Sequence, residues 1–440
     1  MVTIPFIILS VLLFFYSKKM YAGKLNPLSV YTVTFTGMIL LFDLHLILYD
    51  PLSIECGIVL IVGELIFFFG CLQGKRTRVV LKRSRRENDS TETAYNETKL
   101  KKELYKWIII TSGLASIAIL SGFILLLRDY GYSIVRVLAS GAAVYADRMA
   151  GRKNYIFIPY LSSFAYNGMI FAGIYLKRYG FRIFVIVPLI LIGLVTLCTG
   201  NRYMVILAII EFFTAFVLSD TKRERSSKFR KLPLWKKLLF VLPIAGLLFV
   251  FWKVTVARSS FITVNSYVSP TLASMMAKYG NGVYKIYAYA ATPVGVLNAF
   301  LKDPYFHIGH STFGLFYNIL ERLGIITENA RVGRDYYVPI DANTGTYLKN
   351  LIADFSVLAP ISVFIWGFVC SQVYEKVSKR QTITALSVYS VLMSVLAYCF
   401  FTWYFAETST WICIVISIIV GGIIDRRCRT GDEESIGALY

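Results

Sequence analysis

Eleven long apolar stretches constrain this chain more than any other feature of its sequence. They run approximately over residues 2–17, 28–48, 52–72, 107–127, 155–176, 183–200, 203–219, 238–257, 352–374, 383–404 and 408–424. A helix needs about 20 apolar residues to cross the hydrocarbon of a bilayer, and fewer where flanking Lys or Arg side chains reach the headgroups. We therefore expect an all-α polytopic membrane protein with about eleven transmembrane helices.

The composition excludes a soluble enzyme, a secreted disulfide scaffold and a disordered chain. Hydrophobic residues make up 56% of the sequence and charged residues only 16%, which is far from the balance of soluble domains. The seven cysteines lie in or beside apolar stretches without CxxC spacing, so we expect neither disulfides nor a metal site. A transporter, a channel and a membrane-embedded enzyme all remain compatible with this composition.

The distribution of cations predicts how the chain crosses the membrane. If the apolar stretches alternate in direction, 31 of the 46 Lys and Arg residues fall on one side, mostly in short loops. Cytoplasmic loops carry such an excess, so we expect the N-terminus outside and the C-terminus inside. The bilayer thus accounts for the net charge of +20, and no nucleic-acid partner is expected. Cytoplasmic loops are predicted at residues 73–106 and 220–237.

These assignments divide the chain into an N-terminal membrane bundle (1–257), a large outer loop (258–350), C-terminal membrane helices (351–426) and a cytoplasmic tail (427–440). An unstructured loop as long as 258–350 is uncommon in a compact fold and is usually functional. Within it, apolar residues recur at helical spacing from Thr312 to Ile326. This pattern predicts an amphipathic helix that either lies on the outer membrane surface or caps the bundle.

A first candidate site is the turn Gly200-Asn201-Arg202 between two predicted spans. An arginine at the edge of a bilayer, with no carboxylate close in the sequence, favours an anionic partner. That partner is either a lipid headgroup phosphate or the pyrophosphate of a bound substrate. The sequence leaves both open.

The outer loop supplies the second and third groups of candidates. Aromatic faces stack on sugar rings and arginine forks bind phosphate oxygens, although an interfacial aromatic belt explains some of the tyrosines. The predicted substrate-binding residues are Arg258, Arg331, Arg334, Tyr287, Tyr337 and Asn343. The predicted catalytic residues are Arg202 and three candidates for the group that takes a proton, Asp335, Asp354 and His310. Asp354 has an alternative role as a cap at the start of a helix.

Several common catalytic motifs do not occur in the sequence. There is no Asp-x-Asp, Walker loop, GxSxG or HExxH. His307 and His310 are three residues apart without a clear third ligand, so no metal is predicted there.

Four short patches resemble those of the bacterial Wzy-type oligosaccharide repeat-unit polymerases, which extend O-antigen or capsule chains. The patches are Lys24-Leu-Asn-Pro27, Gly200-Asn-Arg202, Tyr287-Ala-Tyr-Ala-Ala-Thr-Pro293 and Asn343-Thr-Gly-Thr-Tyr347 with Asp354-Phe355. The layout is similar over nearly the whole chain. One departure is Ser356, which stands where the family pattern has Gly after Asp-Phe.

The resemblance implies a GT-C-like membrane glycosyltransferase that acts on undecaprenyl-pyrophosphate-linked oligosaccharides at the outer face of the bacterial inner membrane, without metal or cofactor. Arg202 and the loop arginines would then neutralise the departing pyrophosphate. A chain-length regulator is left open as a partner. Two other functions also remain, an O-antigen ligase and a lipid-linked oligosaccharide flippase, although the chain lacks the internal repeats that a transporter predicts.

Overall fold

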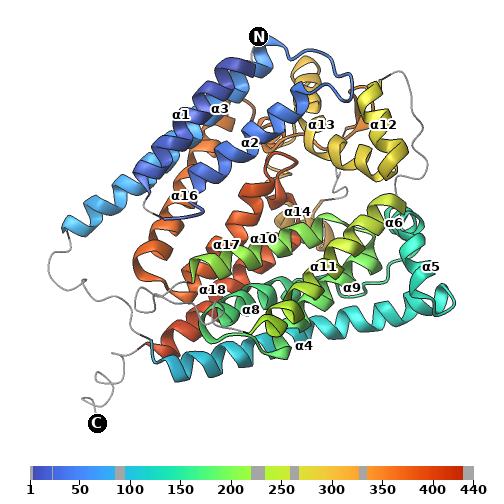
Figure 1. Cartoon of the computed structure of the whole chain (residues 1–440). Helices are drawn as coiled ribbons and strands as arrows, with labels where there is room; N and C mark the ends of the chain where they lie inside the picture. The colour runs from blue at the N-terminus through green and yellow to red at the C-terminus, as the bar shows by residue number, and fades with distance from the viewer. Residues whose placement is uncertain are drawn as a thin grey trace. The chain divides into compact units, whose positions relative to one another are not determined.

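The computed structural model describes residues 3–21, 23–84, 95–219, 233–257, 267–326 and 334–429. The chain forms two compact units, each assembled from three separated segments. Unit 1 comprises Met1–Arg86, Phe261–Glu375 and Val395–Trp411, and unit 2 comprises Glu87–Ser260, Lys376–Ser394 and Ile412–Tyr440. Figure 1 labels their elements.

Unit 1 is built mainly from helices. Its elements are α1 (Thr3–Met20), α2 (Pro27–Asp43), α3 (Ile54–Ser84), α12 (Pro270–Tyr279), α13 (Gly282–Lys302), α14 (Gly314–Arg322), β1 (Tyr336–Tyr337), β2 (Asp341–Ala342), α15 (Tyr347–Phe355), η2 (Ser356–Leu358), most of α16 (Ala359–Arg380) and η3 (Tyr404–Ala406). The strands β1 and β2 pair antiparallel, with Tyr336 opposite Ala342.

Unit 2 is helical in all its described elements. They are α4 (Glu97–Asp129), α5 (Ile134–Ala139), α6 (Gly141–Met149), α7 (Pro159–Ser162), α8 (Phe164–Tyr179), η1 (Ile183–Ile186), α9 (Val187–Thr199), α10 (Tyr203–Leu218), α11 (Leu234–Ala257) and most of α17 (Ile383–Tyr398) and α18 (Thr408–Cys428). The α-helical class predicted from the sequence is therefore confirmed, apart from the small hairpin in unit 1.

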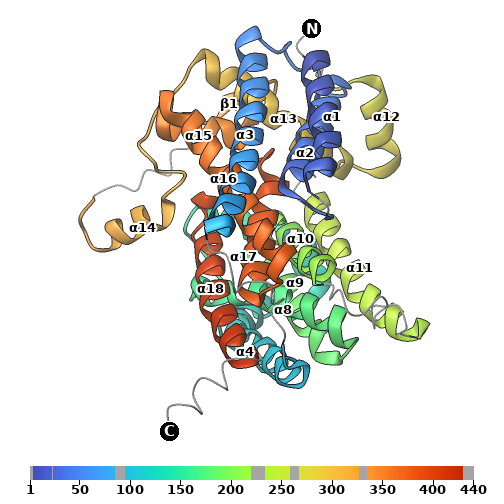
Figure 2. The ribbon, with the colours of Figure 1, turned by 90° about the vertical axis from the view of Figure 1, so that its left-hand side faces the viewer.

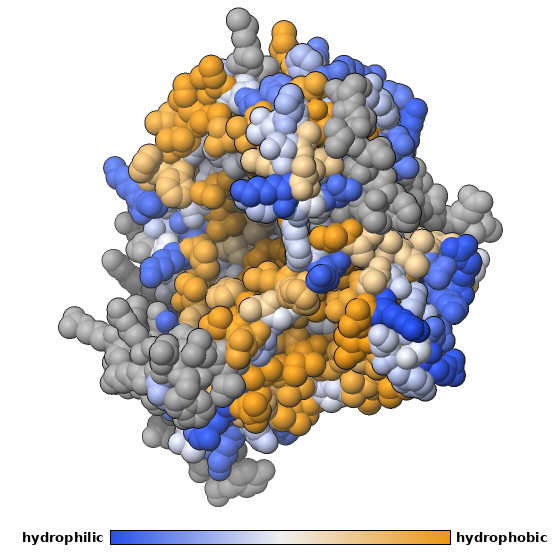
Figure 3. All heavy atoms as spheres, turned by 45° about the vertical axis from the view of Figure 1, so that its right-hand side comes forward, coloured by the Kyte–Doolittle hydropathy of each residue, from blue (hydrophilic) through white to orange (hydrophobic). Residues whose placement is uncertain are grey.

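All eleven predicted stretches contain helix. Among the described residues, five helices are long and apolar enough to cross a membrane, namely α1, the first part of α3, α4, the stretch Tyr347–Arg380 formed by α15, η2 and α16, and α18. Five further apolar helices are shorter, including α2, α10 and α17. These helices are compatible with a multi-pass membrane protein. In Figure 3 apolar side chains form broad areas on the face drawn.

Several helices do not begin or end where the apolar stretches do. The helix α3 continues to Ser84, and α4 already begins at Glu97, so both extend well into the predicted loop 73–106. Lys, Arg and Glu extend a helix as readily as apolar residues do. In the parts of the predicted outer loop 258–350 that the structure describes, 267–326 and 334–350, there are three helices, a hairpin and the first residues of α15. The predicted span 352–374 is interrupted at Ser356, whose φ is +49°.

Close helix packing in unit 1 depends on small residues. Gly70 and Gly74 lie one turn apart on α3 and face α16, and a Cβ at Gly70 would stand only 2.2 Å from the carbonyl oxygen of Phe364. On α16, a Cβ at Gly367 would stand 2.4 Å from the carbonyl oxygen of Phe67. Such small-xxx-small patterns let helix backbones approach closely in membranes. The three glycines therefore fix the contact between α3 and α16.

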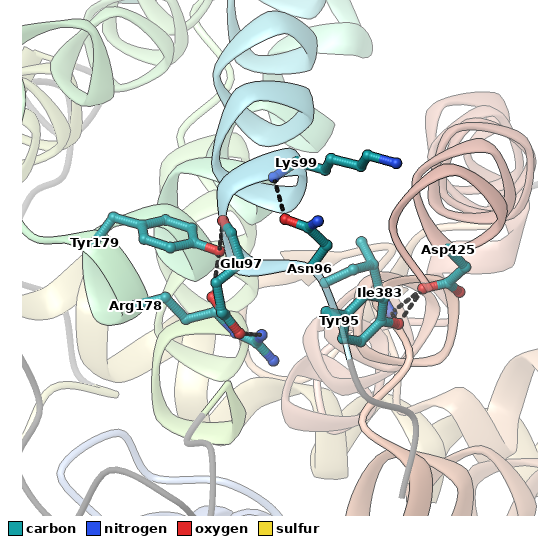
Figure 4. Close-up of polar contacts among 8 residues, drawn as sticks. All are labelled: Tyr95, Asn96, Glu97, Lys99, Arg178, Tyr179, Ile383 and Asp425. Carbon is teal, nitrogen blue, oxygen red and sulfur yellow. Dashed lines mark hydrogen bonds and ion pairs between the residues drawn. The ribbon is translucent and has the colours of Figure 1, made fainter. Parts of the chain in front are cut away.

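A polar cluster joins four helix ends in unit 2 (Figure 4). The carboxylate of Asp425, near the end of α18, accepts hydrogen bonds from the backbone of Ile383 (2.8 Å) and Thr384 (3.1 Å) and from the hydroxyl of Tyr95. It thereby caps the start of α17. Nearby, the hydroxyl of Tyr179 donates to Glu97 at the start of α4 over 2.6 Å. The ends of α4, α8, α17 and α18 therefore lie together.

Candidate functional site

Asp354, one of the predicted catalytic residues, lies near the C-terminal end of α15 with its side chain completely buried. Its Oδ1 accepts a hydrogen bond from the backbone N–H of Ser311 at 2.8 Å, and its Oδ2 accepts one from the hydroxyl of Thr312 at 2.6 Å. The indole of Trp403 in turn donates to that hydroxyl at 3.1 Å. A buried carboxylate with these partners is held in one orientation. It does not cap the start of α15, which was the alternative role.

The imidazole of His307 lies against this carboxylate. Its Nδ1 is 2.8 Å from Oδ1 of Asp354. The side chain of His307 is 13% exposed, whereas that of Asp354 is inaccessible. The backbone N–H of His307 also donates to the carbonyl of Ala353 at 2.8 Å, which fixes this segment against the end of α15. Solvent or a bound molecule can therefore reach His307, whereas the Asp354 carboxylate acts through its neighbours.

The rings of Tyr305 and His310 lie beside His307. The ring centroid of Tyr305 is 5.6 Å away and that of His310 is 5.4 Å away, and His310 is itself 4.9 Å from Tyr317. Burial raises the pKa of Tyr305 to about 12, so that its phenol is neutral at physiological pH. The structure thus brings the predicted residues Asp354 and His310 together through His307. His307 was not among the predicted catalytic residues.

A buried lysine also lies next to Tyr305. Lys349 of α15 is 2% exposed, and its ammonium donates to the carbonyl of Asn343 at 2.8 Å. The same ammonium lies 5.6 Å from the ring centroid of Tyr305 and 5.7 Å from that of Tyr336, within the range of a cation–π interaction. Gly345 makes room for this side chain, because a Cβ there would stand 2.5 Å from Cδ of Lys349.

Two more predicted residues lie around this lysine. Arg334 stacks over the outer side of Tyr336, with Cζ 5.7 Å from the ring centroid, and forms an exposed ion pair of 2.6 Å with Asp303. The carboxylate of Asp335 is exposed and close enough to act electrostatically on Lys349. Arg334, Asp335 and Asn343 therefore gather near Lys349. We call the set Tyr305, His307, Arg334, Tyr336, Lys349 and Asp354 the loop cluster.

Tyr287 and Tyr337 lie outside the loop cluster. Tyr287 on α13 is buried, donates to the carbonyl of Leu41 at 2.7 Å and accepts from the N–H of Leu46 at 3.1 Å, so it ties α13 to the end of α2. Tyr337 is 63% exposed and lines a hollow of about 290 Å³ together with Asn298 of α13. Of these two tyrosines, only Tyr337 offers an accessible ring.

Arg202 belongs to unit 2, where it directly precedes α10 and is 5% exposed. The preceding Gly200 has a φ of +64°, and a Cβ there would stand 2.8 Å from Cβ of Tyr145 on α6. Arg148 of α6 approaches the same turn, and its guanidinium lies 3.5 Å from the carbonyl oxygen of Thr199. The turn therefore gathers two arginines, of which the sequence singled out one. The predicted residues Arg258 and Arg331 lie outside the described residues.

The loop cluster combines groups suited to acid–base and anion chemistry. An imidazole beside a fixed carboxylate can take a proton, because the carboxylate orients the ring and offsets the charge that appears on it. Arginine and lysine near aromatic faces can hold an anion and a ring at once. Among the described residues, no group of three or more His, Cys, Asp and Glu side chains is placed to bind a metal ion.

Comparison of the chain with protein-family models, with characterised proteins and with solved structures finds no match.

Proposed function

We propose that the chain is a membrane glycosyltransferase that polymerises undecaprenyl-pyrophosphate-linked oligosaccharide repeat units into O-antigen or capsular polysaccharide. The observation that carries the proposal is the loop cluster. It combines a group that can accept a proton, His307 beside Asp354, with two cations, Lys349 and Arg334, that lie against aromatic rings. A phosphate-linked glycan presents hydroxyls, sugar rings and an anion, which these groups match.

In the proposed reaction, a hydroxyl oxygen of the acceptor repeat unit attacks the anomeric carbon of the donor sugar. The bond from that carbon to the pyrophosphate oxygen breaks, and undecaprenyl pyrophosphate leaves with the bonding electrons. His307 takes the hydroxyl proton, and Asp354 orients and stabilises the resulting imidazolium. Arg334 binds the pyrophosphate as its charge grows, which is where fixed cations lower a barrier most. By resemblance, Arg202, Arg258 and Arg331 have the same role.

The finer architecture belongs to the same proposal. Eleven spans in a GT-C-like arrangement put the N-terminus outside and the C-terminus in the cytoplasm of a bacterium, with residues 258–350 on the outer face of the inner membrane. The lipid-linked donor is presented on that face. The support for this orientation is the gathering of 31 cations in alternate loops.

A deletion strain complemented with variants tests the function. Loss of the gene should abolish long polysaccharide and leave a single repeat unit on its usual anchor, and the wild-type gene should restore the ladder. His307→Gln should lower the initial rate by about 10²- to 10⁴-fold, the usual contribution of a general base. His45→Gln is the matched control, because His45 is exposed and outside the loop cluster. Loss of all attached glycan on deletion would point instead to a ligase or a flippase.

A further inference from the structure

The polarity of α14 is reversed with respect to a helix that packs against a protein core. On α14, the side chains of Phe316 and Ile319 are 53% and 44% exposed, and that of Leu323, directly after the helix, is 67% exposed. The polar Asn318, by contrast, points toward unit 1, where its amide donates to the hydroxyl of Thr408 at 3.0 Å. In Figure 2, α14 lies at the margin of unit 1, away from α1 and α2. Its apolar face is therefore turned away from the unit to which it belongs.

The exposed apolar surface continues beyond the helix. Ile308, in the segment that is hydrogen-bonded to the end of α15, is 88% exposed. Val357, just beyond that end, is 86% exposed, and Phe313 is 42% exposed. Backbone and ring contacts hold these segments together: Gly309 N–H donates to the carbonyl of Asp354 at 3.1 Å, and the ring of Phe313 lies 6.4 Å from that of Phe355. We call Ile308, Phe313, Phe316, Ile319, Leu323 and Val357 the apolar rim. Large side chains gathered in this way mark an interaction surface.

Contacts with α18 indicate what covers the apolar rim. Phe316 lies 6.2 Å, centroid to centroid, from Trp411 in the first turn of α18, one of the helices long and apolar enough to cross a membrane. The bond from Asn318 to Thr408 ties α14 to the same turn. Tryptophan is enriched where a span meets the headgroups. The helix α14 is therefore held at the level where α18 enters a bilayer.

We propose that α14 is an interfacial helix whose apolar face, Phe316, Ile319 and Leu323, is embedded among the acyl chains of the bilayer that the chain crosses. The exposed Glu321 and Arg322 supply the polar side that such a helix turns to headgroups and water. The bilayer is the occupant rather than a partner protein, because the apolar rim runs on from α14 to Val357, immediately before α16. That helix is itself part of a candidate span.

Embedding α14 would hold the loop cluster at the depth of the headgroups. The segment from His307 to Thr312, which binds Asp354, leads directly into α14. If the proposed function is right, a lipid-linked pyrophosphate reaches His307 and Arg334 without leaving the membrane surface. The position of α14 itself does not depend on that function, and its test needs no substrate.

The test measures the depth of single probes in full-length protein reconstituted into vesicles of phosphatidylethanolamine and phosphatidylglycerol. The change Ile319→Cys, labelled with an environment-sensitive fluorophore, should give blue-shifted emission that is strongly quenched by a spin label on the lipid acyl chain. The matched control is Glu321→Cys on the polar side of α14, whose emission should be quenched severalfold less. All seven native cysteines are buried, and labelling of the wild type measures their background.

A second probe, Leu323→Cys, guards against a local effect at position 319. Equal quenching at 319 and 321, with both probes equally accessible to an aqueous quencher, would overturn the proposal. Blue-shifted emission at 319 that lipid spin labels leave unquenched, and that reverts when the protein is diluted into excess empty vesicles, would overturn it in favour of contact with a second copy. Neither outcome would bear on glycosyltransferase activity, which is measured separately.

Discussion

At the scale of single residues, the surroundings of Asp354 and Lys349 depend on contacts with distant parts of the chain. Asp354 stood out as a carboxylate at the edge of an apolar stretch, but nothing local indicates that its side chain is inaccessible and lies 2.8 Å from His307. Lys349 was one cation among many, because its contact with Tyr305 and Tyr336 depends on residues up to 44 positions away. Such roles arise from long-range contacts, which residue type and spacing do not encode.

Ser356 gives the first prediction at this scale. Its φ of +49° and ψ of −121° lie where glycine is comfortable and a Cβ is strained, and the resemblance expects glycine at this position. Its side chain is exposed, so little packing is lost on truncation. Ser356→Gly should therefore raise the free energy of unfolding by about 0.5–1 kcal/mol, after allowance for the greater chain entropy of glycine.

Thermal unfolding of the purified protein in detergent measures this change. Ser378→Gly, at an exposed position within α16, is the control and should lower stability by about 0.5 kcal/mol, because glycine is the poorer helix former there. A destabilised Ser356→Gly would mean that the serine hydroxyl, rather than the backbone, decides this turn.

At the scale of elements, the existence of helices followed from apolar patterning, whereas their ends did not. An apolar stretch identifies what has to be buried, while a helix continues as long as its backbone is satisfied and its residues permit. For this reason α3 and α4 extend beyond their apolar segments. The start of α2 was readable in principle: Asn26 accepts from the N–H of Ser29 at 2.8 Å, and Pro27 occupies the first helical position.

The contact between α3 and α16 supplies a prediction about element packing. Gly70→Ala places a Cβ 2.2 Å from the carbonyl oxygen of Phe364, a backbone atom that cannot move without shifting α16. We expect a loss of about 1–3 kcal/mol in stability from overpacking, measured as a lower unfolding temperature. Gly37→Ala on α2 is the control, because no atom outside its own helix lies within 4 Å of that Cβ. If the two variants unfold alike, the close approach of α3 and α16 is not what stabilises unit 1.

At the scale of the whole molecule, the sequence predicted the α-helical class but not the grouping of its parts. The sequence suggested consecutive blocks, 1–257, 258–350 and 351–426. Instead each unit combines segments from the beginning, middle and end of the chain, so that residues 1–86 fold with 261–375 and 395–411. Apolar periodicity is local and carries no information on which helices meet. Contacts such as that of Asp425 with Ile383 are visible only after folding.

The last prediction concerns orientation in the membrane, which rests on the positions of cations along the whole chain. We expect Lys101, in the first part of α4, to face the cytoplasm and Lys278, on α12, to face outward; both side chains are exposed. Single cysteines at these positions should react differently with a membrane-impermeant maleimide. Lys278→Cys should label in intact spheroplasts, and Lys101→Cys only after permeabilisation. The unsubstituted protein, whose seven cysteines are buried, gives the background. Labelling of Lys101→Cys alone in intact cells would reverse the orientation of the chain and place residues 258–350 in the cytoplasm, where the donor lipid proposed here is not presented.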